Sequence, residues 1–204
     1  MIATGLDLSL TGTGIATITT GSDNTTATTH TITSKPTPNA TIHDTNQRIR
    51  KLRNTICHHT KHAHLIAIEG PAYNAGGSGA HNLAGLWWAI VAAIDHLQIP
   101  YVIIPPAKVK KFACGVGGGP KAGKAAVAAG ITRMWGDLVT PTDDNQFDAL
   151  GMATMCAIHA THRGQLPIRV LERHYEVVAG IDWPPTPVGP DGRAVTHLDD
   201  ARGA

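Results

Sequence analysis

Four acidic residues stand where carboxylates are unusual, and together they could bind a metal ion. Asp7 lies within the strand-forming stretch MIATGLDLSL, and Glu69 closes the apolar run LIAIE. Asp144 and Asp148 are four residues apart, so on a helix their carboxylates project from one face. An unpaired carboxylate in a buried strand loses its hydration at a large cost in free energy, which a bound cation offsets. The four acids together therefore predict a carboxylate metal site.

Each of these acids also has a simpler interpretation. Asp7 could end its strand and cap the turn that follows. The acids of the segment TPTDDNQFDALGMA could form a capping turn at the start of a helix, with Thr142 or Asp143 as the N-cap. Taken one at a time, none of these acids requires a metal. The presence of all four favours the metal site.

Strand signals dominate the first part of the chain. Residues 1–20 predict a β-hairpin whose arms are divided by a turn, GTG, that begins at Gly12, with Asp7 in the middle of the first arm. Residues 25–33 are rich in threonine and predict a third antiparallel strand. Residues 41–61 have apolar positions at helical spacing and predict a basic amphipathic helix. We interpret its charges as a solvated face rather than a DNA contact.

The middle of the chain predicts parallel strands joined by helices. Residues 65–69 and 99–104 are apolar strands, as expected for the interior of a sheet that is covered on both faces. The order strand, helix, strand implies parallel pairing with crossover helices. If the strands that carry Asp7 and Glu69 are neighbours in a parallel pair, the two carboxylates lie side by side at the carboxyl end of the sheet, where α/β proteins place their sites.

The helix predicted over residues 83–97 is apolar around most of its circumference. A helix of this kind needs burial on two sides. The sheet can cover one side, and a second subunit could cover the other. We therefore expect a homodimer formed through this helix.

A basic, glycine-rich segment follows the last predicted strand. Its glycines gather in residues 115–119, and lysines stand on both sides of them: Lys108, Lys110, Lys111, Lys121 and Lys124. We interpret the segment as a flexible loop that contacts DNA phosphates. An earlier glycine-rich loop carries Tyr73, which could stack on an unpaired base or pack on the adjoining helix.

Part of the basic segment imitates a nucleotide-binding loop. Residues 118–125, GGPKAGKA, fit the spacing of a Walker P-loop. Ala125, however, stands where the magnesium-binding Ser or Thr belongs, and the segment follows a short predicted helix instead of a strand. We therefore favour phosphate contact by a basic loop over nucleotide binding.

Composition restricts the compartment and the partners without deciding the function. The chain has 204 residues and a formal net charge of +2, which permits a nucleic-acid partner without requiring one. Its three cysteines include no CxxC pair, so neither a disulfide framework nor a zinc ribbon is implied. No N-terminal signal precedes the first strand, and the longest apolar run, residues 83–94, is shorter than the ~20 residues that a membrane span needs. We expect a cytoplasmic protein that does not associate with membranes.

Three motifs in this order resemble a known family. GLDLSLTGTGIA with Asp7, LIAIEGPAY with Glu69, and DNQFDALGMA with Asp148, together with the basic glycine loop, are similar to the RuvC family of Holliday junction resolvases in the RNase H-like superfamily. The resemblance covers about residues 2–162. It implies an RNase H-like α/β fold with a five-stranded mixed sheet flanked by helices, a homodimer, and two-metal cleavage of junction DNA with Mg²⁺. The similarity is to phage-type enzymes, which act in the host cytoplasm.

The resemblance also assigns the site residues. It implies that Asp7, Glu69 and Asp148 are catalytic metal ligands. The family often has an acid or His three residues before the final Asp, where this chain has Asn145. Asp144 could supply the fourth carboxylate instead, so both positions remain candidates. Lys124 matches the family's active-site lysine, and Tyr73 matches its loop aromatic, so both join the catalytic or DNA-binding set.

The resulting hypothesis is a magnesium-dependent, structure-selective endonuclease of branched DNA. Two Mg²⁺ ions per site would lie roughly 3.5–4 Å apart with Asp7 bridging them, and Mn²⁺ should substitute. Four-way junctions are the expected substrate, with forks and flaps as further candidates. We expect the nuclease domain to span residues 1–165, and residues 166–204 to form a C-terminal helix and a flexible tail rich in proline and glycine.

Two alternatives remain open at this stage. The chain could be a non-catalytic protein that binds branched DNA with the same fold, although the full set of acids argues against it. GLDLSLTGTG also resembles the first phosphate loop of actin-like ATPases and sugar kinases. Those proteins need two such domains and roughly twice this length, so we rank an actin-like or Walker-type nucleotide-binding protein lower.

Overall fold

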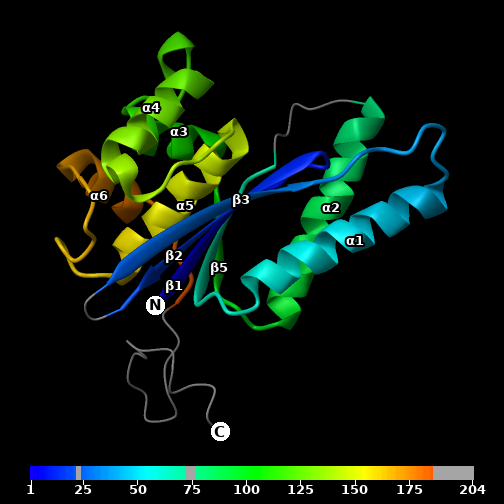
Figure 1. The fold of residues 1–204 in the computed structure, drawn as a ribbon, viewed down its shortest axis with the longest axis horizontal. Helices are drawn as coiled ribbons and strands as arrows, with labels where there is room; N and C mark the ends of the chain where they lie inside the picture. Colours follow the sequence, from blue (N-terminus) through cyan, green and yellow to red (C-terminus); the bar gives the residue numbers. More distant parts are fainter. Residues whose placement is uncertain (22–23, 72–76, 186–204) are drawn as a thin grey trace, which may run out of the picture.

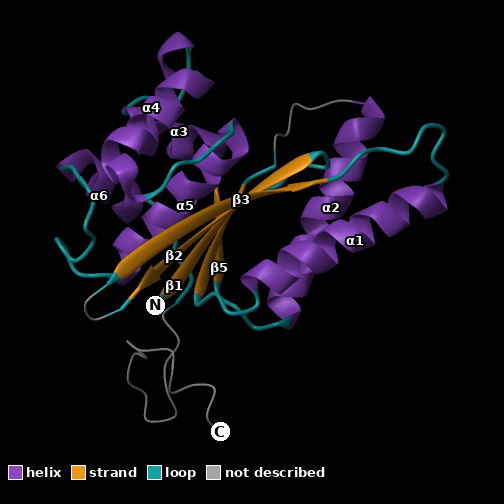
Figure 2. Ribbon diagram, in the orientation of Figure 1, coloured by secondary structure: helices purple, strands orange, loops and turns teal. Residues whose placement is uncertain are grey.

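A five-stranded mixed sheet forms the centre of the molecule, with strand order β3-β2-β1-β4-β5 (Figure 2). The structure is a computed structural model and describes residues 1–21, 24–71 and 77–185. β1, β2 and β3 are antiparallel, whereas β4 and β5 run parallel to β1. The strands are β1 (Ile2–Asp7), β2 (Gly12–Thr20), β3 (Thr25–Thr33), β4 (Leu65–Glu69) and β5 (Tyr101–Ile104). The sheet predicted from the sequence is confirmed.

Helices cover both faces of this sheet (Figure 1). α1 and α2 pack together on one side, and α5 crosses β1 and β2 on the other, where α3, α4 and α6 surround it. We call these the α1/α2 face and the α5 face. The helices are α1 (Ile42–Thr60), α2 (Gly77–His96), α3 (Pro106–Cys114), α4 (Lys124–Trp135), α5 (Asp144–Ala160) and α6 (Glu172–Ala179), with short 3₁₀ turns at Pro120–Ala122 and Gly136–Leu138.

Side-chain alternation along the strands decides which residues face which layer. Leu6 and Ile68 belong to the hydrophobic cluster on the α1/α2 face, whereas Ala3 and Ala67 belong to the cluster around α5. Successive side chains of a strand point to opposite faces. Asp7, one residue after Leu6, and Glu69, one after Ile68, therefore both point to the α5 face.

The turn of the first hairpin differs from the sequence prediction. The strands end at Asp7 and resume at Gly12, so the turn spans residues 8–11 and Asp7 closes β1 instead of lying in its middle. Ser9 and Thr13 brace this turn: the Ser9 N–H donates to Thr13 Oγ1 at 3.1 Å, and the Thr13 hydroxyl donates to the Ser9 carbonyl at 2.7 Å. The predicted GTG turn at Gly12 is wrong, because Gly12 begins β2 and Gly14 lies within it, where the main chain of Asn145 packs closely.

The remaining predicted elements form close to their expected positions. β3 has the predicted limits, and α1 begins after Thr41, whose side chain forms a capping box with Asp44. α2 is longer than predicted, since it begins at Gly77. α6 packs on α3 and α5. Residues 186–204, which include most of the predicted tail, lie outside the described residues.

Candidate active site

Two acids close neighbouring parallel strands. β1 and β4 are parallel neighbours with Leu6 opposite Ile68, which meets the condition under which the sequence places Asp7 and Glu69 side by side at the same edge of the sheet. Both point to the α5 face. Asp7 is 8% exposed, and its carboxyl group lies within hydrogen-bonding reach of the Glu69 carboxyl group. The strand ends therefore bring together two carboxyl groups at a buried position.

α5 adds a third acid, Asp148, because the helix rests directly on the backbone of the sheet. A Cβ atom on Gly5 would overlap the carbonyl oxygen of Ala149, and one on Gly14 would overlap the carbonyl oxygen of Asn145. Only glycine permits so close an approach. The contact places Asp148 next to Asp7 and Glu69. The charge of Asp7 raises the pKa of Asp148, and the charge of Asp148 raises the pKa of Glu69. Nothing local in the sequence indicates this role of the two glycines.

A polar network fixes the first turn of α5 to β3. Asp143 is the N-cap and accepts from the Gln146 N–H at 2.9 Å, while the Thr31 hydroxyl donates to its other oxygen. The Gln146 side chain, 6% exposed, accepts from the Thr29 hydroxyl and donates to Thr31 Oγ1, both at 2.8 Å. Asp143 is one of the two N-caps that the sequence offered, whereas the contacts with Thr29 and Thr31 were not predicted. The network determines where α5 begins and hence where Asp148 lies.

Burial and mutual repulsion raise the pKa of all three acids. Loss of hydration is the main cause for each. The charge of Glu69 adds to the raised pKa of Asp7, and the charge of Asp148 adds to that of Glu69. The pKa of Asp148 rises to about 6, with Asp7 as the second cause. The site therefore holds protons that a cation could replace.

Two lysines lie close enough to counter these charges. Lys110 lowers the pKa of Glu69 and Asp148, and Lys124 lowers that of Asp7 and, more weakly, that of Asp148. Lys110 is on α3 and Lys124 is the first residue of α4, so they reach the site from either side of the glycine-rich segment. They supply positive charge next to the carboxylates.

The donor set fits a hard divalent cation, although the side chains are not arranged as a finished metal site. Asp7, Glu69 and Asp148 offer carboxylate oxygens, which Mg²⁺ prefers. Across residues 1–21, 24–71 and 77–185, no three carboxylates, imidazoles or thiolates converge on a single point. The carboxyl groups of Asp7 and Glu69 lie close enough for a hydrogen bond between them to raise the pKa of Asp7. A cation that bound these oxygens would have to displace the protons held there.

The two candidates for the fourth ligand occupy different places. Asp144 Oδ2 lies 2.8 Å from Lys124 Nζ at the rim of the site, and the Asp144 side chain is 46% exposed. Its charge helps to raise the pKa of Asp148. Asn145 packs its Cβ and main chain over Gly14 in β2. Both candidates border the acids, and the identity of the fourth ligand stays a prediction.

The lysines predicted to contact DNA divide into three groups. Lys110 and Lys124 approach the acids, while Lys111 and Lys121 are exposed beside them in sequence. Lys108 points elsewhere, since its ammonium group donates to the carbonyl of Gly180 and ties α3 to the end of α6. Tyr73 lies outside the described residues.

The segment that imitates a P-loop does not follow a strand. Residues 118–125 run from the loop after α3 through a 3₁₀ turn into α4. A P-loop needs a strand before it and a helix after it, so that main-chain N–H groups surround the phosphates. This placement agrees with the sequence argument against nucleotide binding.

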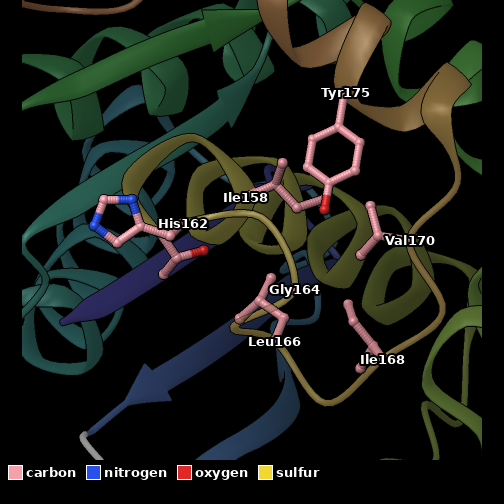
Figure 3. Close-up of a pocket in the computed structure, with 8 residues that line it drawn as sticks. Ile158, His162, Gly164, Leu166, Ile168, Val170 and Tyr175 are labelled. Atoms are coloured by element: carbon pink, nitrogen blue, oxygen red, sulfur yellow. The ribbon is translucent and has the colours of Figure 1, made fainter.

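A separate small pocket of about 90 Å³ lies at the opposite end of α5 (Figure 3). Ile158 of α5 and Tyr175 of α6 lie side by side in its lining. Ile158 is ten residues from Asp148, which is about 15 Å along a helix. The pocket is therefore not part of the acidic site.

No family model matches this chain, and no curated protein matches it in sequence. Among solved structures it is similar to Thermus thermophilus RuvC, with a TM-score of 0.61 and 20% identity over 78% of this chain and 95% of that one. It is also similar to T. thermophilus RuvC in complex with Holliday junction substrate, with a TM-score of 0.59 and 19% identity over 78% and 94% of the two chains.

These similarities extend over most of the chain and concern its fold. The five-stranded mixed sheet with flanking helices is a RuvC-like, RNase H-like fold, as the sequence resemblance implied. No helix in the described part of the chain is both long enough and apolar enough to cross a membrane.

Proposed function

We propose that this RuvC-like chain is a metal-dependent endonuclease that cleaves branched DNA, with four-way junctions as its preferred substrate. The observation that carries the proposal is the convergence of Asp7, Glu69 and Asp148 at one buried edge of the sheet. Buried carboxyl groups with raised pKa values are costly to the fold and are typical of functional sites. One similar structure, that of T. thermophilus RuvC, holds a Holliday junction substrate, which makes branched DNA the first substrate to test.

In this proposal Asp7, Glu69 and Asp148 would hold two Mg²⁺ ions. When bound, the metal would supply an activated water and stabilise the leaving oxygen of the phosphodiester. The carboxyl groups must lose their protons to bind metal, so metal binding competes with protons at this site. Mn²⁺ should substitute for Mg²⁺, because it also accepts carboxylate and water ligands.

The lysines of α3 and α4 position the DNA. Lys110 and Lys124 lie next to the acids and can pair with the scissile phosphate or its neighbours. Lys111 and Lys121 are exposed along the same segment and can contact the backbone further away. Lys108 is a weaker candidate than the sequence indicated, because it is engaged with Gly180.

A homodimer would form through the outer side of α2. Leu86 and Ile90 on its inner side are fully buried, so the interface must use other residues. Trp88 is 65% exposed, and Ala84 and Ala92 are exposed one turn before and after it. A second copy that covered Trp88 would give the assembly two active sites, and a four-way junction requires two cuts.

The test is a cleavage panel of a four-way junction, a fork, a flap and a linear duplex in Mg²⁺, with Asp7→Asn as the matched inactive variant. We expect paired cuts on the junction by the wild type, none by Asp7→Asn, and equal junction binding by both proteins in Ca²⁺. Junction binding without cleavage in Mg²⁺ or Mn²⁺ would identify a non-catalytic junction-binding protein. Cleavage by Asp7→Asn at the wild-type rate would place the chemistry elsewhere.

A further inference from the structure

A tryptophan on the α1/α2 face bonds to the main chain of one of the acids on the other face. Trp87, on α2, donates its indole Nε1–H to the carbonyl oxygen of Glu69 at 3.0 Å. We propose that Trp87 is a positioning residue that holds Glu69 in the orientation needed for metal binding. The inference rests on the proposed function, in which Glu69 is a metal ligand.

Glu69 needs such support because of its place in the sheet. It is the last residue of β4, and the last pair of the β1–β4 ladder is Leu6 with Ile68. On the β5 side, the next residue is secured, since the Gly70 N–H donates to the Ile104 carbonyl at 2.9 Å. Main-chain groups of alternate residues point to opposite neighbours, so the Glu69 carbonyl points toward β1, beyond the last pair. The Trp87 indole supplies a donor there.

The ring of Trp87 is itself held in place. It is half-buried against the hydrophobic cluster of the α1/α2 face and meets Trp88 edge-on, with ring centroids 5.0 Å apart and an interplanar angle of 87°. An indole has a single donor and no acceptor, so its orientation is set by one carbonyl. Trp87 therefore fixes the main chain of Glu69 from the α1/α2 face, through a hydrogen bond to its carbonyl oxygen.

This arrangement predicts a specific defect when the donor is removed. Fixing the carbonyl of a residue restricts rotation of its main chain, and so limits how far the Glu69 carboxylate can move away from Asp7 and Asp148. Residues that orient a metal ligand through a hydrogen bond typically contribute about tenfold to a hundredfold to metal affinity or activity. Loss of the Trp87 donor should weaken metal binding and slow cleavage without weakening DNA binding.

The experiment compares Trp87→Phe with Trp183→Phe. Trp183 is a matched control because its indole also donates to a main-chain carbonyl, that of Val178, at 2.9 Å, but far from the site along the chain. Mn²⁺ binding to the metal-free proteins is measured by calorimetry, and kcat and KM are measured on a four-way junction. We expect Trp87→Phe to bind Mn²⁺ at least tenfold more weakly, with a lower kcat and an unchanged KM for DNA, and Trp183→Phe to match the wild type.

A readout that needs no metal follows the main chain directly. In hydrogen exchange of the metal-free proteins, the amides of Glu69 and Gly70 should exchange faster in Trp87→Phe than in the wild type, and Trp183→Phe should leave them unchanged. If Trp87→Phe does not fold, benzothienylalanine at position 87 removes the N–H and keeps the ring shape. Unchanged exchange at these amides, or Mn²⁺ affinity equal to that of Trp183→Phe, overturns the proposal.

The two proposals fail in different ways. If the wild type binds Mn²⁺ but cleaves no branched DNA, the nuclease function is wrong, while the comparison of Trp87→Phe with Trp183→Phe still decides whether Trp87 positions Glu69. If the wild type cleaves junctions and Trp87→Phe cleaves them with the same kcat and metal dependence, only the positioning role is wrong.

Discussion

The two faces of the sheet are packed by different means. On the α1/α2 face, large aliphatic side chains fill the space between sheet and helices, such as Ile68 of the sheet and Ile90 of α2. On the α5 face, Gly5 and Gly14 remove side chains altogether, and the helix main chain lies against the strands. The acids that we assign to the active site are all on the second face.

Main-chain contact holds the site in position more tightly than side-chain packing would. A layer of side chains can adjust by changing rotamers, so small shifts of α1 or α2 are absorbed. A helix in main-chain contact with a strand has no such freedom. Because α5 cannot slide over Gly14, the distance between Asp148 and the ends of β1 and β4 is fixed by the fold. Precise alignment of ligands is what metal-dependent catalysis requires.

The largest expected effect is the loss of cleavage when an acid of the α5 face, and not one of the α1/α2 face, is neutralised. Asp148→Asn should reduce junction cleavage in Mg²⁺ by about a thousandfold or more, the scale seen when a preorganised electrostatic contact is lost. Asp95→Asn is the control, since Asp95 is exposed on α2. Cleavage rates at saturating DNA, with binding measured in Ca²⁺, decide the comparison. Equal rates for both variants would remove Asp148 from the catalytic set.

The second prediction tests the packing itself. The methyl group of Gly14→Ala would overlap the carbonyl oxygen of Asn145, so α5 must move. Overpacking of this kind typically costs about 1–3 kcal/mol in stability. Ile68→Ala, on the α1/α2 face, should cost about 2–5 kcal/mol through the cavity it leaves. Gly14→Ala should nevertheless lose more activity, because it displaces Asp148.

For each variant, urea unfolding gives the free energy of unfolding and junction cleavage gives kcat, both at 20 °C, where the variants remain folded. Ile68→Ala should keep a kcat close to that of the wild type in spite of its larger loss of stability. If kcat instead falls in proportion to the free energy of unfolding for both variants, packing on the α5 face has no special role in positioning Asp148.

The helices, the strands and the three principal acids could be predicted from the sequence because short local patterns indicate them. An acid at the end of an apolar run, as in LIAIE, and alternation along β1 are patterns of a few residues. The turn at Gly12 was wrong because local rules interpret two glycines as a turn. Inside β2, tertiary contact with α5 explains the glycine at position 14 instead.

Other parts of the site depend on residues distant in sequence, so no local pattern could indicate them. Gln146 meets Thr29 and Thr31 across more than a hundred residues. Trp87 reaches Glu69 only because α2 packs behind β4. Trp87 lies in the apolar helix predicted over residues 83–97, and that pattern describes its ring and not its N–H group.

The third prediction concerns stability and pH. Burial, with the charge of Asp7, raises the pKa of Asp148 from 3.8 to about 6. Between these pH values the folded protein keeps a proton that the unfolded chain releases, so the free energy of unfolding falls as the pH rises through this window. A shift of this size corresponds to on the order of 3 kcal/mol. The metal-free site therefore destabilises the fold at neutral pH.

Asp148→Asn carries no charge at any pH and should be more stable than the metal-free wild type above pH 6, with a difference that shrinks toward pH 4. Urea unfolding from pH 4 to pH 8 in EDTA measures it. Asp95→Asn, which changes an exposed acid on the other face, should show no such pH-dependent gain. A difference between Asp148→Asn and wild type that stays constant with pH would contradict a raised pKa at this position.

The smallest expected effect concerns the fourth acidic position. Asp144 pairs with Lys124 at the rim, and its charge adds to that of Asp148. Asn145 contacts Gly14 through its Cβ and main chain, and alanine keeps both. Asp144→Ala should therefore lower kcat by about tenfold, the lower end of the loss seen when a group behind a metal ligand is removed. Asn145→Ala should change kcat very little.

A third variant, Asp144→Asn, distinguishes charge from shape at this rim position. Asparagine can still accept a hydrogen bond from Lys124 but adds no negative charge to the metal site, so Asp144→Asn should resemble Asp144→Ala if the charge is what matters. If Asp144→Asn is fully active, Asp144 serves only to place Lys124. If Asn145→Ala loses more activity than either Asp144 variant, the amide oxygen of Asn145 is the fourth ligand, and the ligand spacing on α5 is three residues instead of four.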